Sequence, residues 1–150
     1  MNKSPVTYQT KTATEKNIFL HLEDCDNNFT PPLSERTDLA SYAKKLFERS
    51  VTFEAWRDDR LIGLIAAYLS SGDIRSAFIT NISVTKEFTG RGIASRLLRN
   101  CIAHCTKNSY FVINLEVNRN NSRAISFYEK HQFKQSGARE DSLVLTLNLK

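Results

Sequence analysis

The sequence predicts an α+β fold that forms one domain over residues 1–150. Segments in which apolar and polar residues alternate, such as SLVLTLNL at 142–149, indicate strands. Segments in which apolar residues recur every three or four positions, such as residues 91–107, indicate helices. In chain order the elements read β-α-α-β-β-β-α-β-α-β-β, without an internal repeat or a linker. This order favours a single α+β domain.

Two helices are expected in the first half of the chain, separated by a turn-rich segment. Thr14 is the expected N-cap of the first helix, and the turn formers in DNNFTPPL end it. Ser34 is the expected cap of the second helix, whose apolar face includes Leu46 and Phe47. The expected elements of this half are a strand at 6–10, helices at 14–25 and 34–49, and strands at 51–56 and 61–69.

In the second half, a fourth strand leads through a glycine-containing bend into the strongest helix of the chain. Cys101 and Cys105 belong to the apolar stripe of that helix. The next strand is largely apolar, which predicts burial on both of its faces. The expected elements are strands at 76–84 and 110–117, a helix at 91–107, a short helix that begins at 120 or 121 and ends at 131, and strands at 133–137 and 142–149.

The charge of the chain is unevenly distributed. Residues 1–75 hold ten Lys/Arg and eleven Asp/Glu, whereas residues 76–150 hold eleven Lys/Arg and five Asp/Glu. The two halves therefore carry formal charges of −1 and +6. A basic half suits an anionic partner, which could be nucleic acid or a phosphorylated cofactor. The basic residues gather near the glycine bend, so a nucleic-acid partner is not expected.

The cysteine count and the chain start bear on where the protein works. Three cysteines are present, and an odd number argues against a disulfide-stapled secreted protein. The first residues are polar, and no apolar run approaches the roughly 20 residues that cross a bilayer. A cytoplasmic protein without a membrane partner is therefore expected.

Gly90 and Gly92 stand in a bend between a strand and a helix. Glycines adopt positive φ and let a ligand approach the backbone closely. The first turn of a helix carries free N–H groups and partial positive charge, so it can bind phosphate. A lone G-x-G is equally consistent with a turn that simply requires glycine. The dinucleotide fingerprint is absent, because no third glycine follows and no acidic residue stands about 20 positions on.

The segment TGRGIA at 89–94, after a strand ending ISV, resembles the acetyl-CoA loop of the GNAT acetyltransferase superfamily. Thr89 stands where that loop usually has Gln or Arg. The resemblance implies a mixed, mostly antiparallel sheet flanked by about four helices, and acetyl-CoA as co-substrate. It also implies that Val84 donates its backbone N–H to the acetyl oxygen. The cofactor-binding residues that it implies in this part of the chain are Ile82, Ser83, Val84, Thr89, Gly90, Arg91, Gly92, Ile93, Ala94 and Ser95.

A second block, LEVNRNNSRAISFYEKHQF at 115–133, also resembles the GNAT pattern. Asn121, Ala124 and Tyr128 fall on one face of the expected helix, where a ligand could lie, although a capped core helix would show the same spacing. Gln132 replaces the glycine that is usual after the helix. The resemblance adds Asn121, Ala124 and Tyr128 to the cofactor contacts. The tail of the chain resembles the ribosomal-protein alanine acetyltransferase branch of the superfamily.

Acetyl transfer to an amine requires an acid and a base. The resemblance places Tyr128 beside the cofactor sulfur, where a phenol could protonate the departing thiolate. Glu116 is the candidate base, because burial in the apolar strand FVINLEV would strengthen it, and the resemblance gives the matching glutamate this role. A carboxylate that only orders a loop or binds the acceptor, with water as the relay, stays open for Glu116. A core tyrosine that bonds a backbone carbonyl stays open for Tyr128.

The sequence thus favours an acyl-CoA-dependent N-acetyltransferase acting by direct transfer. The acceptor could be a small amine, an amino sugar or a protein N-terminus, and a homodimer is compatible with the resemblance. No metal is expected, since Cys101, His104 and Cys105 share one helix without a second ligand cluster. The alternative from another class is a non-catalytic module that binds or senses acyl-CoA. The segment Phe29–Pro32 is equally consistent with a lid over the acceptor site and with a plain connection.

Overall fold

The computed structural model describes residues 4–29 and 31–150, and the order of its helices and strands is the one predicted. The helices are α1 (Glu15–Cys25), α2 (Leu39–Arg49), α3 (Ile93–Lys107) and α4 (Ser122–Lys130), and three short 3-10 turns are η1 (Asp26–Asn28), η2 (Leu33–Glu35) and η3 (Lys86–Phe88). The strands are β1 (Thr7–Thr10), β2 (Val51–Arg57), β3 (Arg60–Ser71), β4 (Arg75–Val84), β5 (Val112–Asn118), β6 (Lys134–Ala138) and β7 (Ser142–Asn148).

The seven strands are hydrogen-bonded in the order β1-β2-β3-β4-β5-β7-β6. β4 and β5 pair in parallel, whereas β1 with β2, β2 with β3, β5 with β7 and β6 with β7 pair antiparallel. The expected mixed, mostly antiparallel sheet with four helices is therefore confirmed. No helix in the described part of the chain is long and apolar enough to cross a membrane.

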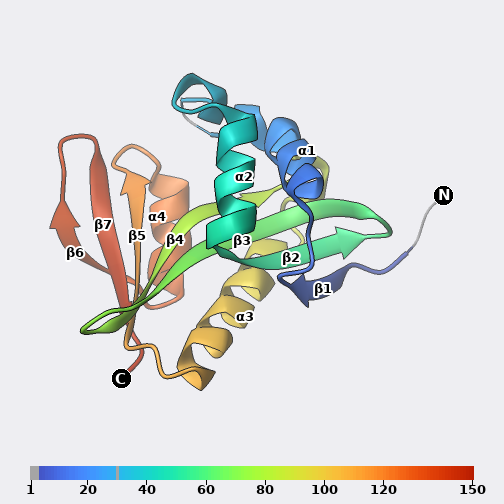
Figure 1. Ribbon diagram of the computed structural model, residues 1–150. Helices are drawn as coiled ribbons and strands as arrows, with labels where there is room; N and C mark the ends of the chain where they lie inside the picture. Colours follow the sequence, from blue (N-terminus) through green and yellow to red (C-terminus); the bar gives the residue numbers. More distant parts are fainter. Residues whose placement is uncertain (1–3, 30) are drawn as a thin grey trace. The chain divides into compact units, whose positions relative to one another are not determined.

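The chain divides into two compact units, Met1–Ala67 with Asn81–Cys101, and Tyr68–Thr80 with Ile102–Lys150. β3, β4 and α3 each begin in one unit and end in the other. In the first unit, α1 and α2 lie on one face of β2 and β3, and the beginning of α3 lies on the other face (Figure 1). The middle of β3 is buried on both faces as a consequence.

The helix starts follow local capping chemistry, and one of them corrects the sequence prediction. Thr14 caps α1 as expected, and it forms a capping box with Asn17. α2 begins at Leu39 rather than near Ser34, because Asp38 accepts the capping hydrogen bond. Ser34 instead donates its backbone N–H and its hydroxyl to Asp26, at 2.7 and 2.6 Å. Phe47, which was expected on the apolar face of α2, is 44% exposed.

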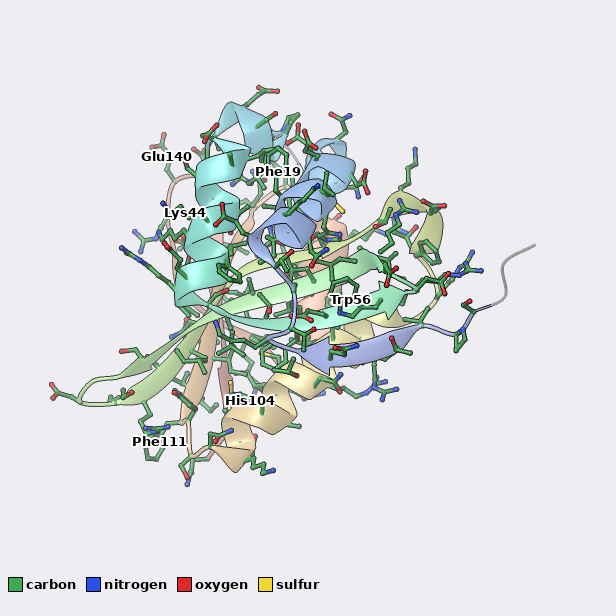
Figure 2. The ribbon with its side chains drawn as sticks, turned by 45° about the vertical axis from the view of Figure 1, so that its right-hand side comes forward. Phe19, Lys44, Trp56, His104, Phe111 and Glu140 are labelled. Carbon is green, nitrogen blue, oxygen red and sulfur yellow. The ribbon has the colours of Figure 1, made fainter. Side chains whose placement is uncertain are left out.

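A buried carboxylate fastens the segment between β1 and α1 to the sheet. Glu54 of β2 is fully buried and accepts hydrogen bonds from Thr12 N and Oγ1 (2.9 and 2.5 Å) and from Ala13 N (3.0 Å). It also accepts from Thr52 Oγ1 (2.5 Å) and from the Trp56 indole N–H (3.0 Å). Figure 2 labels Trp56 on β2. Burial raises the carboxyl pKa, but these donors outweigh burial and hold the pKa below its ordinary value.

The second unit is built around β5, which pairs with β4 on one side and β7 on the other. Figure 1 shows β5, β7 and β6 running next to one another. Ile113, Leu115 and Val117 are buried, but Glu116 between the last two is exposed. The expectation that this strand is buried on both faces is therefore wrong. Its alternation is the pattern of a strand with one covered face.

α4 ends in a Schellman motif, in which the backbone carbonyl of Tyr128 accepts a hydrogen bond. Phe133 N donates to Tyr128 O (3.1 Å) and Gln132 N donates to Glu129 O (3.0 Å). The rings of Tyr128 and Phe133 meet edge to face with centroids 5.8 Å apart. Gln132 has φ +75°, in the left-handed region that favours glycine. Gln132 thus replaces the usual glycine, and the helix end keeps the left-handed backbone geometry that favours glycine.

Replacing Gln132 by glycine is expected to stabilise the protein, because the side chain at φ +75° costs about 1 kcal/mol. We expect Gln132→Gly to raise the free energy of unfolding by about that amount in urea titrations. Gln132→Ala is the matched control, since alanine keeps the Cβ and should change the stability by less than about 0.5 kcal/mol. Equal stabilities for the Gly and Ala variants would contradict the assignment of strain to this position.

Candidate active site

The bend after β4 has the backbone that its two glycines predict. η3 is followed by Thr89, whose N and Oγ1 both donate to Lys86 O, at 3.2 and 2.8 Å. Thr89 therefore closes the turn, which is a local use for the residue that departs from the usual Gln or Arg. Gly90 and Gly92 both have φ +78°, and apart from each glycine and its two chain neighbours no described atom lies within 4 Å of where a Cβ would stand. These glycines are required by their conformation, and they leave the backbone open.

The first turn of α3 presents backbone donors next to this bend. The first helical hydrogen bond runs from Arg96 N to Gly92 O (3.0 Å). The N–H groups of Gly92, Ile93 and Ala94 precede that bond, so the helix offers them no carbonyl. Together with the partial positive charge of the helix start, they fit a phosphate group.

Cationic side chains around the bend are held against aromatic rings. The Arg57 and Arg91 guanidinium carbons lie 5.4 and 5.0 Å from the centroid of buried Phe88. The Arg96 guanidinium carbon lies 4.6 Å from the centroid of Tyr8 on β1. These contacts fix part of the positive charge that the sequence places near the bend.

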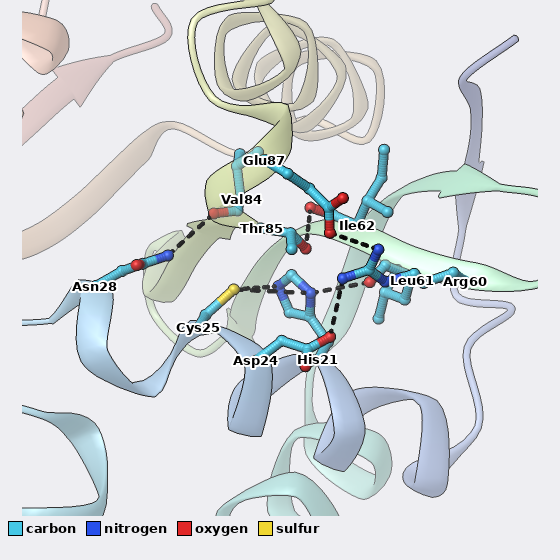
Figure 3. A network of polar contacts seen from close by, with 10 residues as sticks. All are labelled: His21, Asp24, Cys25, Asn28, Arg60, Leu61, Ile62, Val84, Thr85 and Glu87. Carbon is cyan, nitrogen blue, oxygen red and sulfur yellow. Dashed lines mark hydrogen bonds and ion pairs between the residues drawn. The ribbon is translucent and has the colours of Figure 1, made fainter. Parts of the chain in front are cut away.

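The end of β4 is fastened from several directions within the first unit. Thr85 donates its N–H and its hydroxyl to Ile62 O, at 2.8 and 3.1 Å. Asn28, from η1, donates its amide to Val84 O at 3.2 Å. Figure 3 shows both contacts together with His21 beneath them. The peptide units on either side of Thr85 are therefore anchored to β3 and to the segment after α1.

His21 of α1 links the same strand end to β3. It is 1% exposed, with Nδ1 3.0 Å from Leu61 O and Nε2 2.9 Å from Ser83 Oγ. A carbonyl can only accept, so Nδ1 carries the proton and the neutral ring accepts at Nε2 from the Ser83 hydroxyl. Ser83 Oγ also lies 2.9 Å from Asn81 Oδ1, which is a second acceptor for the same hydroxyl proton.

Burial sets the protonation of His21 and Cys25. Burial lowers the pKa of His21 to about 4 against the hydrogen bond to Leu61 O, which favours the charged form. Burial raises the pKa of the Cys25 thiol to about 11. At neutral pH the ring is therefore uncharged and the thiol keeps its proton. Sequence reasoning gave neither residue a role, because a lone His on an apolar helix face carries no distinctive pattern.

An open depression of about 560 Å3 lies beside the strand end, lined by Thr85, Lys86, Glu87, Asp24 and Arg60. Arg60 bridges the two carboxylates, 2.7 Å from Glu87 and 3.4 Å from Asp24 (Figure 3). All three side chains are about half exposed, so each pair contributes little to stability.

In the second unit, Tyr128 lies on α4 with only 5% of its surface exposed. Its ring packs against Phe127 and Phe133, with centroids 5.4 and 5.8 Å away. Burial raises the pKa of its phenol above the ordinary value, so the group stays protonated at neutral pH. Within the described part of the chain, no hydrogen bond of this hydroxyl is found to a backbone carbonyl.

Asn121 and Ala124 have a structural connection to each other. Asn121 is the N-cap of α4, and its side-chain oxygen accepts from Ala124 N at 3.1 Å. The amide side chain expected on the ligand face is therefore engaged in capping.

Glu116 differs from its sequence prediction in one respect. It points to the face opposite Leu115 and Val117, as expected, but its side chain is 38% exposed rather than buried. It forms an ion pair with Arg139, whose side chain is 72% exposed. The sequence of this apolar strand did not reveal that only one of its two faces is covered by the rest of the protein.

Two arginines of the second unit were not singled out by the sequence. Arg119 donates to Arg139 O through Nε (3.1 Å) and Nη2 (2.7 Å), and to Glu140 O through Nε (3.0 Å). Arg139 N donates to Ser142 O at 2.8 Å, which closes the β6–β7 turn. Arg119 thus secures the turn from which the Arg139 side chain reaches Glu116.

Cys101 and Cys105 are fully buried on α3, as core packing predicts. Within residues 4–29 and 31–150, no group of three His, Cys, Asp or Glu side chains is arranged to hold a metal ion.

The pattern of the chain matches a family model over residues 17–133, described as the acetyltransferase (GNAT) family. The chain belongs to this family. This match confirms the family that the sequence motifs suggested. GNAT proteins are acyl-CoA-dependent transferases. A relative of the chain is N-alpha-acetyltransferase 60 of Xenopus tropicalis, which is 38% identical over 76 residues. That match covers 49% of this chain and 31% of the relative, so the chain spans about a third of the relative's length.

Solved structures share the GNAT fold over nearly the whole chain. The Escherichia coli ribosomal-protein-S18-alanine N-acetyltransferase is 20% identical, with a TM-score of 0.79 over 97% of this chain and 95% of that one. The Thermoplasma acidophilum PaiA N-acetyltransferase, solved with coenzyme A, is 18% identical, with a TM-score of 0.76 over 95% and 99%. Arabidopsis thaliana Naa50, bound to the bisubstrate analogue CoA-Ac-MVNAL, is 23% identical, with a TM-score of 0.74 over 95% and 97%.

The neutral, buried state of His21 predicts a pH dependence of stability. The unfolded chain binds a proton at a pKa near 6.5 and the folded chain only near 4, so the stabilisation is full above pH 6.5 and is lost as the pH falls to 4. We expect a loss of about 3 kcal/mol over that window in urea titrations. His21→Asn keeps a donor for Leu61 O and cannot titrate, so its stability should fall less. Parallel pH curves for the two proteins would refute this account.

Proposed function

We propose that the chain is an N-acetyltransferase that moves an acetyl group from acetyl-CoA directly to an amine. The observation that carries this proposal is the bend at Gly90 and Gly92, both at φ +78°. It leads into the start of α3, where the helix offers no carbonyl to the N–H groups of Gly92, Ile93 and Ala94. In a chain of the GNAT family, such a bend fits the diphosphate of coenzyme A.

The binding roles follow from where each backbone donor lies. We assign the N–H groups of Gly90, Gly92, Ile93 and Ala94 to the diphosphate. The end of β4 is the proposed pairing partner of the pantetheine arm. The Val84 N–H is the proposed donor to the acetyl oxygen as negative charge develops there. The hydrogen bond from Asn28 to Val84 O and those from Thr85 to Ile62 O restrain that strand end.

Tyr128 is the proposed acid. A thiolate leaves when the thioester breaks, and a buried phenol that stays protonated can supply its proton. Asn121 holds the first turn of the helix and the Schellman motif holds its last turn, so both ends of the element that carries Tyr128 are fixed.

A covalent cysteine intermediate is not required. Cys25 is fully buried and its raised pKa keeps the thiol protonated, which makes it a poor nucleophile. Cys101 and Cys105 are equally buried. The burial of all three cysteines is consistent with direct attack by the amine on the thioester.

We propose the α-amine of a polypeptide as the acceptor. The names of three similar proteins point to N-terminal substrates: a ribosomal-protein alanine, the peptide part MVNAL, and an N-alpha-amine. An α-amine has a pKa near 7.7–8.0, so a sizeable share is neutral at physiological pH. Such an acceptor needs less help from a base than lysine does, which agrees with a Glu116 that is exposed and ion-paired.

Release of free thiol from acetyl-CoA tests the function and distinguishes it from a binding module. The panel contains peptides with free and formylated N-termini, lysine, a polyamine and an amino sugar. We expect thiol release with free N-termini and none with formylated ones. Coenzyme A binding without turnover on any amine would favour the non-catalytic module instead.

Removing the phenol should impair the chemical step. Tyr128→Phe keeps the packing on Phe127 and Phe133, and we expect kcat to fall by about 100-fold with the coenzyme A affinity unchanged. The comparison uses saturating acetyl-CoA, with calorimetry for the affinity. Full turnover by the variant would remove Tyr128 from the mechanism.

The role of Glu116 can be separated from that of its ion pair. If Glu116 accepts the amine proton, Glu116→Gln should lower kcat by about 100-fold. Arg139→Gln is the matched control, because it breaks the same pair but keeps the carboxylate. We expect the control to retain kcat within about threefold. Equal losses in both variants would assign the pair to loop ordering, and unchanged activity in Glu116→Gln would point to a water relay.

A further inference from the structure

Gly63 of β3 is a glycine that the sequence does not distinguish, and its surroundings are crowded. A Cβ at this position would stand 2.9 Å from Ile93 Cγ2, 3.1 Å from Leu97 Cδ1 and 3.2 Å from Ala55 Cβ. Real side chains essentially never approach below 3.0 Å, so an added methyl group requires a neighbour to move. The backbone at Gly63 does not have a positive φ, so space is the reason for the glycine.

The neighbour that would have to move is the first turn of α3. Ile93 is the first residue of that helix, and its Cγ2 is bonded directly to Cβ, so it cannot swing aside as a long side chain can. Ile93 and Leu97 are both buried and lie one turn apart on the helix face that meets β3. The overlap is therefore transmitted to the backbone of the helix start.

We infer that Gly63 is a positioning residue for the coenzyme A diphosphate. By letting the start of α3 rest directly on β3, it fixes where the donors of Gly92, Ile93 and Ala94 stand. This inference rests on the proposed function of that bend. Gly63 itself touches no ligand and acts through the helix.

The other glycines support this distinction. Gly90 and Gly92 have open space around them and are required by their φ. The atoms nearest to an added Cβ lie 3.8 Å away at Gly72 and 3.7 Å away at Gly137, which is ordinary contact. Of the five glycines, all of them described, Gly63 is the one whose Cβ would meet the helix that carries the phosphate donors.

The experiment is calorimetric titration of coenzyme A into the full chain, paired with steady-state kinetics. We expect Gly63→Ala to weaken coenzyme A binding by about tenfold and to raise KM for acetyl-CoA equally. kcat at saturation should stay within about twofold, because the diphosphate is remote from the reacting carbonyl. Gly72→Ala is the matched control and should bind as the wild type does.

A second variant separates positioning from simple destabilisation. Gly63→Ala combined with Ile93→Ala removes the overlapping methyl, and we expect its affinity to return to within about threefold of Ile93→Ala alone. Should Gly63→Ala fail to fold, Gly63→Ala with Ala55→Gly relieves the crowding inside the sheet and keeps the overlap with Ile93, so it should still bind weakly.

Wild-type affinity in a folded Gly63→Ala protein would overturn the inference, and so would a loss of affinity that Ile93→Ala does not relieve. Absence of coenzyme A binding by the wild type would instead overturn the proposed function, which keeps the two failures distinct.

Discussion

The close contact between β3 and the first turn of α3 is the constraint on which the proposed coenzyme A site of this protein depends. A helix start binds an anion only if its donors stand at a defined place, and side-chain packing is what defines that place. At Gly63 the helix meets the strand with no Cβ between them. The neighbouring bend then needs only two positive-φ glycines to bring the chain from β4 into the helix.

A second set of constraints consists of polar groups inside the first unit. Glu54 and His21 are both buried, one charged and one neutral, and each is satisfied by a complete set of partners. Unsatisfied, either group would be costly. Each group joins segments far apart in the sequence: Glu54 joins β2 to the approach to α1, and His21 joins α1 to β3 and β4.

The two proposed catalytic side chains have contrasting surroundings. Tyr128 is buried against the rings of Phe127 and Phe133, and its burial raises the phenol pKa so that the group stays protonated at neutral pH. Glu116 is exposed, and its partner Arg139 comes from a turn that Arg119 secures. The proposed acceptor, a protein α-amine that is already partly neutral at physiological pH, suits such an arrangement better than a strongly basic amine would.

The sequence by itself determined the order of the elements, the bend and the family, because periodicity, caps and glycine spacing are local properties of the chain. It assigned Thr14 to the start of α1 correctly but placed the start of α2 near Ser34, since Ser34 and Asp38 are both good caps. Only the tertiary structure decided that Ser34 donates hydrogen bonds to Asp26 and that Glu116 is exposed to solvent. It also decided that position 63 has no room for a side chain. These three features depend on which segments, distant in the chain, become neighbours in the fold.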